Sequence, residues 1–569
     1  MSARPPPALV AGAAEVIRCN IAACLPAMAH RQPHALAVIF PQGRDAHGKR
    51  AYTHLTYAQL DAHSDQIGRG LLRYGLRRGM RTVLMVRPSL EFFALTFALF
   101  KAGIVPVLID PGLGVRQLKT CLAQAAPEAF IGIPQAHAAR AVLGWGRGTL
   151  RHLVTVGSRW AWGGTTLQAV TDLGAQPGAE PVLADTQAHE TAAILFTSGS
   201  TGIAKGVVYS HGQFVAQVEL IRATYHIVPG EIDLPTFPLF ALFDPALGMT
   251  TVVPDMDFTR PAAVDPRKIL EAIEDFGVTN VFASPALLAT VSRHGVQHGI
   301  KWPSVKRILT AGAPVPAATL ARMHLMLGPE AEIFTPYGAT EALPVSSIGS
   351  RTVLGETRVR TERGAGVCVG LPVRPNDVRI IAISDVPIAN WAQVQELPVG
   401  EIGEIAVAGP SVTQTYLGRP EATALAKIAR GETTVHRMGD VGYFDAQGRL
   451  WFCGRKSHRV QLPDRTLFSA PVEEVFNTHP AVLRTALVGV QIAGVTEALL
   501  CVERAPGSTR TDTALWQELK DLAARHETTR GIDRFLRHPG FPVDIRHNAK
   551  IGREKLAVWA QARVRHGQT

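Results

Sequence analysis

The chain has 569 residues, which predicts two or more domains. Its hydrophobic content of 46% and charged content of 18% are those of a soluble globular protein. The net charge of +11 is spread along the chain without a basic run of five residues, so it favours a generally basic protein over a nucleic-acid surface. The six cysteines form no CxxC pair, which argues against a structural zinc site or a disulfide framework and predicts a cytoplasmic location.

The amino terminus lacks the sustained apolar region of a signal peptide. The most apolar stretch, residues 92–109, is interrupted by Lys101, Gly103 and Pro106. A membrane span needs about 20 apolar residues, so we interpret this stretch as a buried helix followed by a strand. We therefore expect no transmembrane segment, although contact with a membrane surface stays open.

Amphipathic helical segments alternate with short β-branched runs from about residue 35. In chain order the pattern predicts helix 60–74, strand 82–86, helix 90–102, strands 105–109 and 192–196, a helix from about 212, and further α/β units through residues 281, 307–310 and 332–335. This alternation is typical of layered α/β structure with largely parallel sheets.

After about Gly364 regular glycines and short strands, such as 404–407, predict a β-rich subdomain. Residues 445–448 read as a tight hairpin between strands 441–444 and 450–453. Beyond Arg455 the α/β pattern returns, with a helix at 473–477, a strand at 486–489 and a helix at 513–526. We expect an N-terminal domain over 1–455 and a C-terminal domain over 456–569.

A loop rich in glycine and hydroxyl residues follows strand 192–196. It consists of Thr197, Ser198, Gly199, Ser200, Thr201, Gly202, Ile203, Ala204 and Lys205. Glycine lets backbone amides approach an anion, hydroxyls add donors and lysine adds charge, so the loop predicts phosphate binding. It does not fit the Walker A pattern. A flexible surface turn is the alternative that composition alone leaves open.

With its neighbours in the sequence, this loop resembles the signature of the adenylate-forming superfamily of acyl-CoA synthetases, luciferases and peptide-synthetase adenylation domains. Further motifs of that family occur in the same order: 100–103 with 110–111, 311–314, 337–341, 437–440 and 454–455. The resemblance covers nearly the whole chain. It implies an ATP-dependent enzyme that adenylates a carboxylate, with a smaller, mobile α+β C-terminal domain.

The resemblance also implies roles for individual residues. Tyr337 would stack on adenine beside Gly338, with backbone contacts from Gly312, Ala313 and Pro314. Thr340 would donate to a phosphate, and Glu341 would supply an oxygen ligand for Mg²⁺. Asp440 would accept the ribose hydroxyls, with Arg455 as a nearby cationic fork.

The final motif lies near the carboxyl end, where Lys550 matches the catalytic lysine of the superfamily. A lysine there lets a carboxylate and the α-phosphate approach, and stabilises the charge that develops on phosphorus. Ala549 replaces the usual glycine before it.

Other positions in the sequence bear on which group accepts the acyl group from the adenylate. Thioester-forming members of the family admit pantetheine along a glycine-containing loop, whereas this chain has Ser457 at the hinge and Pro463 and Arg465 in the following loop. The segments 237–248 and 340–346 resemble the β-lactone-forming branch found in bacterial long-chain olefin biosynthesis. That resemblance implies a long-chain 2-alkyl-3-hydroxy fatty acid as substrate and other enzymes of olefin biosynthesis as partners.

Two further readings remain open, a long-chain fatty acid–CoA ligase and an inactive nucleotide-binding scaffold. Retention of Lys205, Glu341, Asp440 and Lys550 speaks against the scaffold. We expect Phe240, Phe243 and Met249 to line an acyl pocket. His211 and His436 lie near motifs and are candidate bases, although a structural role fits each of them better.

Overall fold

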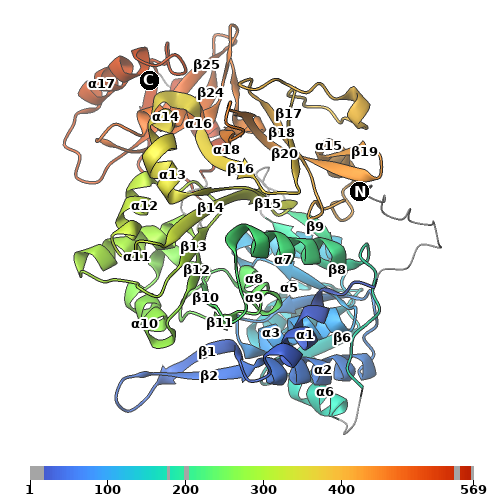
Figure 1. Ribbon diagram of the computed structural model, residues 1–569. Coiled ribbons are helices and arrows are strands. Elements are labelled where there is room, and N and C mark those ends of the chain that lie inside the picture. Colours follow the sequence, from blue (N-terminus) through green and yellow to red (C-terminus); the bar gives the residue numbers. More distant parts are fainter. Residues whose placement is uncertain (1–17, 176–179, 198–203, 544–550, 566–569) are drawn as a thin grey trace, which may run out of the picture.

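The computed structural model describes residues 18–175, 180–197, 204–543 and 551–565 (Figure 1). The described elements form three layered regions, and Figure 1 shows them from the blue and cyan first sheet at the bottom to the red C-terminal elements at the top. The expected α/β fold class, with a large N-terminal part and a smaller C-terminal part, is confirmed.

The first sheet has seven strands in the order β7-β6-β5-β3-β4-β8-β9. Its strand pairs are parallel except for β8–β9, so strands β3, β4 and β8 end at the same edge. The strands are β3 (Arg81–Met85), β4 (Val105–Ile109), β5 (Ala129–Gly132), β6 (His152–Thr155), β7 (Thr165–Thr166), β8 (Thr191–Thr197) and β9 (Lys205–Ser210).

Helices cover both faces of this sheet. On one face Leu84 and Leu108 pack in a core with helices α2 (Tyr57–Arg73) and α3 (Leu90–Lys101). On the other face Val83 and Val107 pack in a separate core with α4 (Val115–Ala125) and α5 (Pro134–Leu143). Helices α1 (Cys24–Arg31) and α6 (Leu167–Gly174) complete the first face. The two cores follow from the opposite orientation of successive side chains in a strand.

The second sheet has fourteen strands, of which thirteen follow the path β17-β18-β20-β21-β16-β15-β14-β13-β12-β10-β11-β1-β2, with β19 paired to β20. Strand pairs from β14 through β11 to β1 are parallel, and the remaining pairs are antiparallel. The parallel part contains β1 (Leu36–Arg44), β10 (Ile232–Pro235), β11 (Thr250–Val252), β12 (Asn280–Ala283), β13 (Arg307–Thr310) and β14 (Glu332–Ala339). The units expected at 281, 307–310 and 332–335 are therefore confirmed.

The antiparallel part confirms the expected change to β-rich structure. It contains β15 (Ala342–Gly349), β16 (Val367–Pro372), β17 (Asp377–Ile381), β18 (Gly403–Ala408), β19 (Lys427–Arg430), β20 (Thr433–Phe444) and β21 (Leu450–Arg455), and β2 (Arg50–Thr56) lies at the other end of the sheet. The predicted hairpin joins β20 to β21. Its Asp445 carboxylate accepts hydrogen bonds from the backbone N–H groups of Gln447 and Arg449 at 3.0 and 2.9 Å, and Gly448 has φ +73.

Helix α7 (His211–Tyr225) leads from β9 of the first sheet to β10 of the second. Strands of the second sheet are connected through α8 (Pro238–Ala241), α9 (Asp244–Leu247), α10 (Pro266–Phe276), α11 (Pro285–Gln297), α12 (Ala317–His324) and α15 (Pro420–Ala426). A further helical stretch between β15 and β16 includes α13 (Ser350–Thr352) and α14 (Arg358–Arg360) and was not predicted from the sequence.

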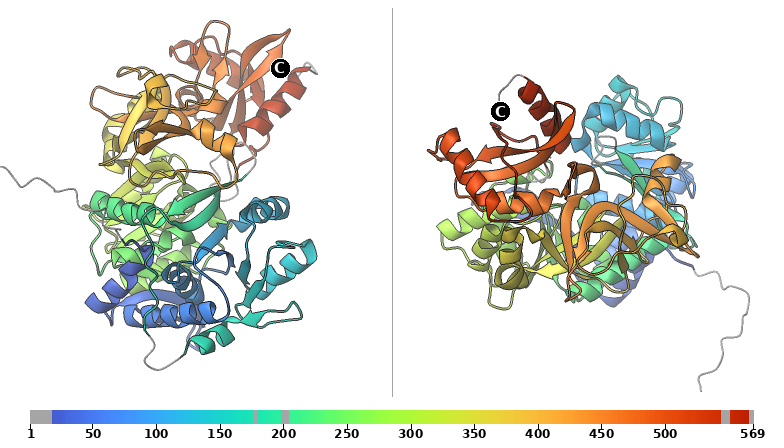
Figure 2. Two further views of the ribbon diagram at one scale, coloured as in Figure 1. Left: turned by 90° about the vertical axis from the view of Figure 1, so that its right-hand side faces the viewer. Right: turned by 90° about the horizontal axis from the view of Figure 1, so that it is seen from above.

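The C-terminal elements form a third sheet in the order β24-β25-β26. Its members are β24 (Val482–Ile492), β25 (Val495–Arg504) and β26 (Phe535–Arg537), with helices α16 (Ser469–Phe476), α17 (Asp512–Ala524) and α18 (Arg553–Arg565). Figure 2 shows these red elements together at one end of the molecule. The domain boundary at 455/456 stays a prediction, and the third sheet lies wholly on its C-terminal side.

All six cysteines are free, which agrees with the absence of a disulfide framework in the sequence pattern. Within the described ranges, none of the helices combines the length and hydropathy that a membrane crossing needs. Lys101, in the interrupted apolar stretch, is only 1% exposed and pairs with Asp61 and Asp65 at 2.5 and 2.8 Å. Its charge therefore ties α3 to α2 inside the core.

Candidate active site

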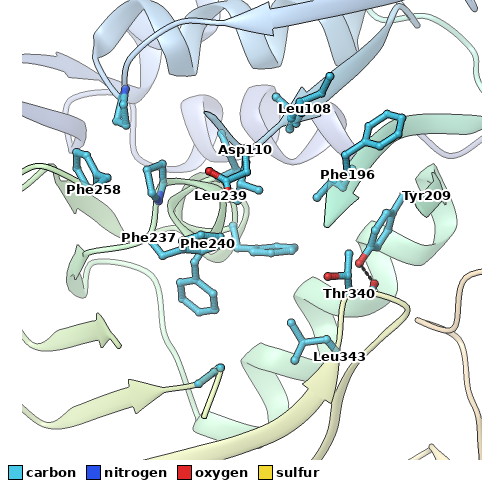
Figure 3. Close-up of a pocket in the computed structure, with 18 of the residues that line it drawn as sticks. Leu108, Asp110, Phe196, Tyr209, Phe237, Leu239, Phe240, Phe258, Thr340 and Leu343 are labelled. Atoms are coloured by element: carbon cyan, nitrogen blue, oxygen red, sulfur yellow. Dashed lines mark hydrogen bonds between the residues drawn. The ribbon is translucent and has the colours of Figure 1, made fainter. Parts of the chain in front are cut away.

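A cavity of about 1570 Å³ lies between the first two sheets and reaches the start of the C-terminal region (Figure 3). Its polar lining includes Asp110, Lys205, Thr340, Glu341 and Arg455. Its remaining walls are largely apolar and rich in phenylalanine. The cavity therefore combines a charged end with a large hydrophobic compartment.

The predicted phosphate loop joins strands β8 and β9. Thr197 pairs with Lys205 in register, so the loop leaves and re-enters the sheet at the same level. Ser198, Gly199, Ser200, Thr201 and Gly202 lie outside the described residues, and only the backbone of Thr197 is described. The ammonium of Lys205 lies 4.9 Å from the ring centroid of Tyr416, a cation–π contact at the cavity wall.

The turn between β14 and β15 brings Gly338, Thr340 and Glu341 to the cavity. The phenol of Tyr416 donates to the Glu341 carboxylate at 2.6 Å, and burial and this carboxylate both raise the pKa of Tyr416. The Tyr209 phenol donates to the backbone carbonyl of Thr340. These two bonds fix the turn from strand β9 on one side and from the segment before α15 on the other.

A buried lysine supports this turn from behind. Lys427 donates to the backbone carbonyl of Thr413 and, at 3.3 Å, to its hydroxyl, while the Thr413 N–H donates to the Glu341 carbonyl at 2.9 Å. Burial lowers the pKa of Lys427 to about 7, and the nearby Glu341 carboxylate only partly opposes that shift.

Asp440, the predicted ribose acceptor, lies in β20 and is already engaged by protein groups. Its Oδ2 accepts the Tyr337 hydroxyl at 2.6 Å, and its Oδ1 lies 3.0 Å from a guanidinium nitrogen of Arg455. The Asp440 carboxylate raises the pKa of Arg455, which keeps this arginine charged. Arg455 lines the cavity, whereas Asp440 and Tyr337 lie behind the cavity wall. A ribose would therefore share Asp440 with these partners or displace them.

The loop after β13 was predicted to contact adenine. Ala311 and Gly312 line the cavity, but Ala313 and Pro314 do not. Gly312 has φ +97, a conformation that favours glycine, so its residue type is explained by the turn. Contact of the whole loop with adenine stays a prediction.

Lys456, next to the predicted hinge position Ser457, is held by a buried carboxylate. Glu404 pairs with Lys456 at 3.1 Å and with Arg437 at 2.6 Å, and the side chains of Glu404 and Arg437 are each 1% exposed. Lys456 and Ser457 line the cavity, and the 463–465 turn that follows does not. The side chain of Arg465 donates instead to the backbone carbonyl of Arg530.

The predicted catalytic Lys550 and the preceding Ala549 lie outside the described residues. The described chain resumes at Ile551, and Arg553 at the start of α18 pairs with Glu473 of α16. This pair fixes the start of α18 against α16.

The two histidines differ in position. His211 is 1% exposed, lies off the cavity, and accepts the backbone N–H of Ile21 at 3.2 Å, while burial lowers its pKa to about 4. These contacts give His211 a structural role. His436 lines the cavity with its Nδ1 at 3.1 Å from the Ala426 carbonyl, and burial lowers its pKa well below the usual value. It is neutral, which leaves Nε2 as an acceptor when Nδ1 donates.

Two of the three residues expected to line an acyl pocket lie at the cavity, and acyl binding there stays a prediction. Phe240 and Phe243 line the cavity, and Phe240 stacks on Phe282 with ring centroids 3.9 Å apart. The expectation for Met249 was wrong, because Met249 is buried in the core and its carbonyl accepts the Tyr57 hydroxyl at 2.7 Å. Helix α9 ends at Leu247, and the turn at Gly248 directs the next residue inward.

The described residues hold no group of three or more His, Cys, Asp or Glu side chains suited to a metal ion, so the predicted Mg²⁺ ligand Glu341 is not part of such a group. Magnesium usually keeps several waters and binds one or two protein carboxylates plus substrate phosphates. A glutamate in the same cavity as Lys205 of the predicted phosphate loop therefore fits Mg²⁺ that arrives with ATP better than a structural metal centre.

The chain belongs to the AMP-binding enzyme family, whose sequence pattern matches residues 25–417. An olefin β-lactone synthetase of Xanthomonas campestris pv. campestris is 55% identical to it, over 96% of this chain and 98% of the relative. Its counterpart in Stenotrophomonas maltophilia is 56% identical over 96% and 99%. A feruloyl-CoA synthase of Amycolatopsis is more distant, at 31% identity over 81% and 84%.

Solved structures agree on the fold. An amide bond synthetase from Marinactinospora thermotolerans has a TM-score of 0.78 at 23% identity, covering 95% of this chain and 99% of that one. The ATP-bound MatB of Rhodopseudomonas palustris has a TM-score of 0.75 at 21% identity, over 96% and 99%.

Sequence reasoning missed Tyr416, Lys427 and Tyr209. Tyr416 is 75 residues from Glu341 in the chain, and its local sequence signals only a turn before α15. Lys427 begins a short strand and carries no motif. Only the three-dimensional fold brings these side chains to the turn at Glu341.

Proposed function

We propose that the protein activates a long-chain 2-alkyl-3-hydroxy fatty acid with ATP and closes it to a β-lactone, releasing AMP and pyrophosphate. The observation that carries this proposal is the single cavity that joins Lys205, Thr340, Glu341 and Arg455 to an extensive aromatic and aliphatic compartment. The identity of more than half to two olefin β-lactone synthetases over nearly the whole chain supports the same reaction.

In the first step a carboxylate oxygen of the substrate attacks the α-phosphorus of ATP. The bond between the α- and β-phosphates breaks, pyrophosphate leaves and an acyl-adenylate remains. Lys205 would supply positive charge to the phosphates, Thr340 in the same cavity would donate to one of them, and Lys550 would bring the two anions together. Mg²⁺ would be held by Glu341 and would neutralise phosphate charge.

In the second step the 3-hydroxyl oxygen attacks the activated C1 carbonyl. The bond from C1 to the adenylate oxygen breaks, AMP leaves and the hydroxyl proton is released. Because the nucleophile belongs to the same molecule, the protein has only to orient it, which can contribute about 7–11 kcal/mol in well-oriented cases. The apolar walls of the cavity would also limit competing attack by water.

A long-chain acyl-CoA ligase is the second candidate, favoured by the 31% identity to a feruloyl-CoA synthase. The two functions differ in their need for CoA. Pyrophosphate release should depend on a 3-hydroxy acid and continue at the same rate without CoA. Strict dependence on CoA would exclude the lactone proposal.

We further propose a cytoplasmic location and transfer of the water-insoluble product to other enzymes of olefin biosynthesis. The six free thiols support a reducing compartment. Co-purification of the tagged protein with other enzymes of olefin biosynthesis from the same cell would test this association.

A further inference from the structure

The cavity reaches both faces of the first sheet at the end of three adjacent strands. Two consecutive residues of each strand line it: Leu84 and Met85 of β3, Leu108 and Ile109 of β4, and Leu195 and Phe196 of β8. Successive side chains of a strand point to opposite faces. One cavity can contact both members of each pair only if it passes around the strand ends.

The two faces belong to separate hydrophobic cores. Leu84, Leu108 and Leu195 pack with the core of helices α2 and α3. Met85, Ile109 and Phe196 pack with the core of helices α4 and α5. The cavity therefore has two apolar branches, each continuous with a different core.

The first branch, which we call the α8 arm, is bounded by Phe237, Leu239, Phe240 and Phe258. Figure 3 shows Phe237 and Phe258 on one side of the cavity and Phe196 and Tyr209 on the other. The α8 arm includes the segment that was expected to bind the acyl chain.

The second branch, which we call the α5 arm, is bounded by Leu118 of α4, Ala136 and Ala139 of α5, and Trp145. Trp145 is buried in the same core as Ile109 and Phe196. No sequence motif pointed to this branch.

Polar groups mark the junction of the arms. Asp110 follows Ile109 directly at the end of β4, and Lys205 opens β9 opposite Thr197. Thr340 lies between Tyr209 and Leu343 in Figure 3 and also lines the cavity. A carboxyl group at this junction would have an apolar branch on either side of the sheet edge.

A 2-alkyl-3-hydroxy acid matches two apolar branches beside a polar junction, since its two alkyl chains diverge from adjacent carbons next to one carboxyl group. We propose that the α8 arm and the α5 arm each receive one alkyl chain of the substrate. This inference rests on the proposed function and specifies how the site selects acids with two chains over acids with one.

The test fills one arm at a time. Ala139→Trp would obstruct the α5 arm and Leu239→Trp the α8 arm, and both replaced side chains are only partly buried, which limits the disturbance of the core. Each variant is assayed for lactone formation with three acids: one with two long chains, one with a short 2-alkyl chain, and one with a short chain beyond C3.

Each variant should lose at least about tenfold in kcat/KM for the acid with two long chains, because the pocket then rejects several methylenes. Each should retain activity within about twofold on one of the shortened acids, and the two variants should retain different ones. That retained activity also serves as the control for folding.

The two-arm inference would be overturned if both variants retained activity on the same shortened acid. It would also be overturned if both variants lost activity equally on all three acids while their melting temperatures were unchanged. Failure of the wild-type protein to form lactone from any of the acids would instead contradict the proposed function. The two failures are therefore distinguishable.

Discussion

The phenol of Tyr416 donates a hydrogen bond to the carboxylate of Glu341 at 2.6 Å, while the same ring lies 4.9 Å below the ammonium of Lys205. One side chain thus contacts both the predicted metal ligand and the cation of the phosphate loop. Its position connects the two charges that ATP would meet on entering the cavity.

Replacing Tyr416 by phenylalanine removes the hydroxyl and keeps the ring under Lys205. A hydrogen bond to a charged group contributes about 1.5–3 kcal/mol, so we expect the Mg²⁺ concentration for half-maximal pyrophosphate release to rise at least about tenfold. Tyr52→Phe is the matched control, because Tyr52 donates to Asp275 away from the cavity. An unchanged dependence on Mg²⁺ concentration would show that the Tyr416 hydroxyl does not support the predicted metal ligand.

Asp440→Asn should raise the KM for ATP by about 10–100-fold, since the amide leaves Arg455 without its anion and weakens the acceptor for ribose. The KM for the acid should change little. Asp521→Asn, on the exposed surface of α17, controls for the loss of one negative charge. If the KM for the acid rose and the KM for ATP did not, the assignment of Asp440 to the ribose would be wrong.

Lys550→Ala should lower ATP–pyrophosphate exchange by at least about 10²-fold, the usual effect of removing one group that stabilises developing charge. ATP binding, measured by calorimetry, should persist. Lys555→Ala is the control, because Lys555 is exposed in α18. Normal exchange by Lys550→Ala would show that another residue is the catalytic lysine.

The folded-state pKa of Lys427, lowered by burial to about 7, has a consequence for stability. Between pH 7 and about 10.4 the unfolded chain holds a proton that the folded chain lacks, so this residue makes stability rise with pH. The contribution is constant below pH 7.

In urea unfolding at pH 7, 8 and 9, the free energy of unfolding should therefore rise more steeply in the wild-type protein than in Lys427→Met. The difference in slope should approach about 1.4 kcal/mol per pH unit. Parallel pH profiles would mean that Lys427 keeps its proton in the folded state.

Glu404→Gln should destabilise the protein by about 3–5 kcal/mol, because it leaves the buried Arg437 and the partly buried Lys456 without their shared anion. Glu401→Gln, three residues earlier and exposed, should have almost no effect. Chemical denaturation of the two variants gives this comparison directly. Equal stability of the two variants would show that the Glu404 pairs contribute nothing.

The sequence allowed the fold class and the order of the main elements to be predicted because each signal is local. The alternation of helix and strand fixed β3, α3 and β4, and the glycine and serine residues marked the loop after β8. The hairpin at Asp445 followed from its turn residues alone. Family motifs then gave Glu341, Asp440 and Arg455 expected roles.

What could not be predicted depends on contacts between distant segments. Tyr416 reaches Glu341 across 75 residues, and Lys427 supports Glu341 through the backbone of Thr413. Met249 is apolar, as expected of a residue that lines an acyl pocket, but its side chain is buried in the core after the turn at Gly248. The two arms of the cavity became visible only when both faces of β3, β4 and β8 could be placed around one space.

The most direct test of the account is identification of the product formed from ATP, Mg²⁺ and a synthetic 2-alkyl-3-hydroxy acid in the absence of CoA. Nuclear magnetic resonance and mass spectrometry would distinguish the β-lactone from unreacted acid, and a parallel reaction with CoA would reveal a thioester. The account predicts one β-lactone per AMP released, with or without CoA. Acyl-CoA as the sole product, formed only when CoA is present, would contradict it.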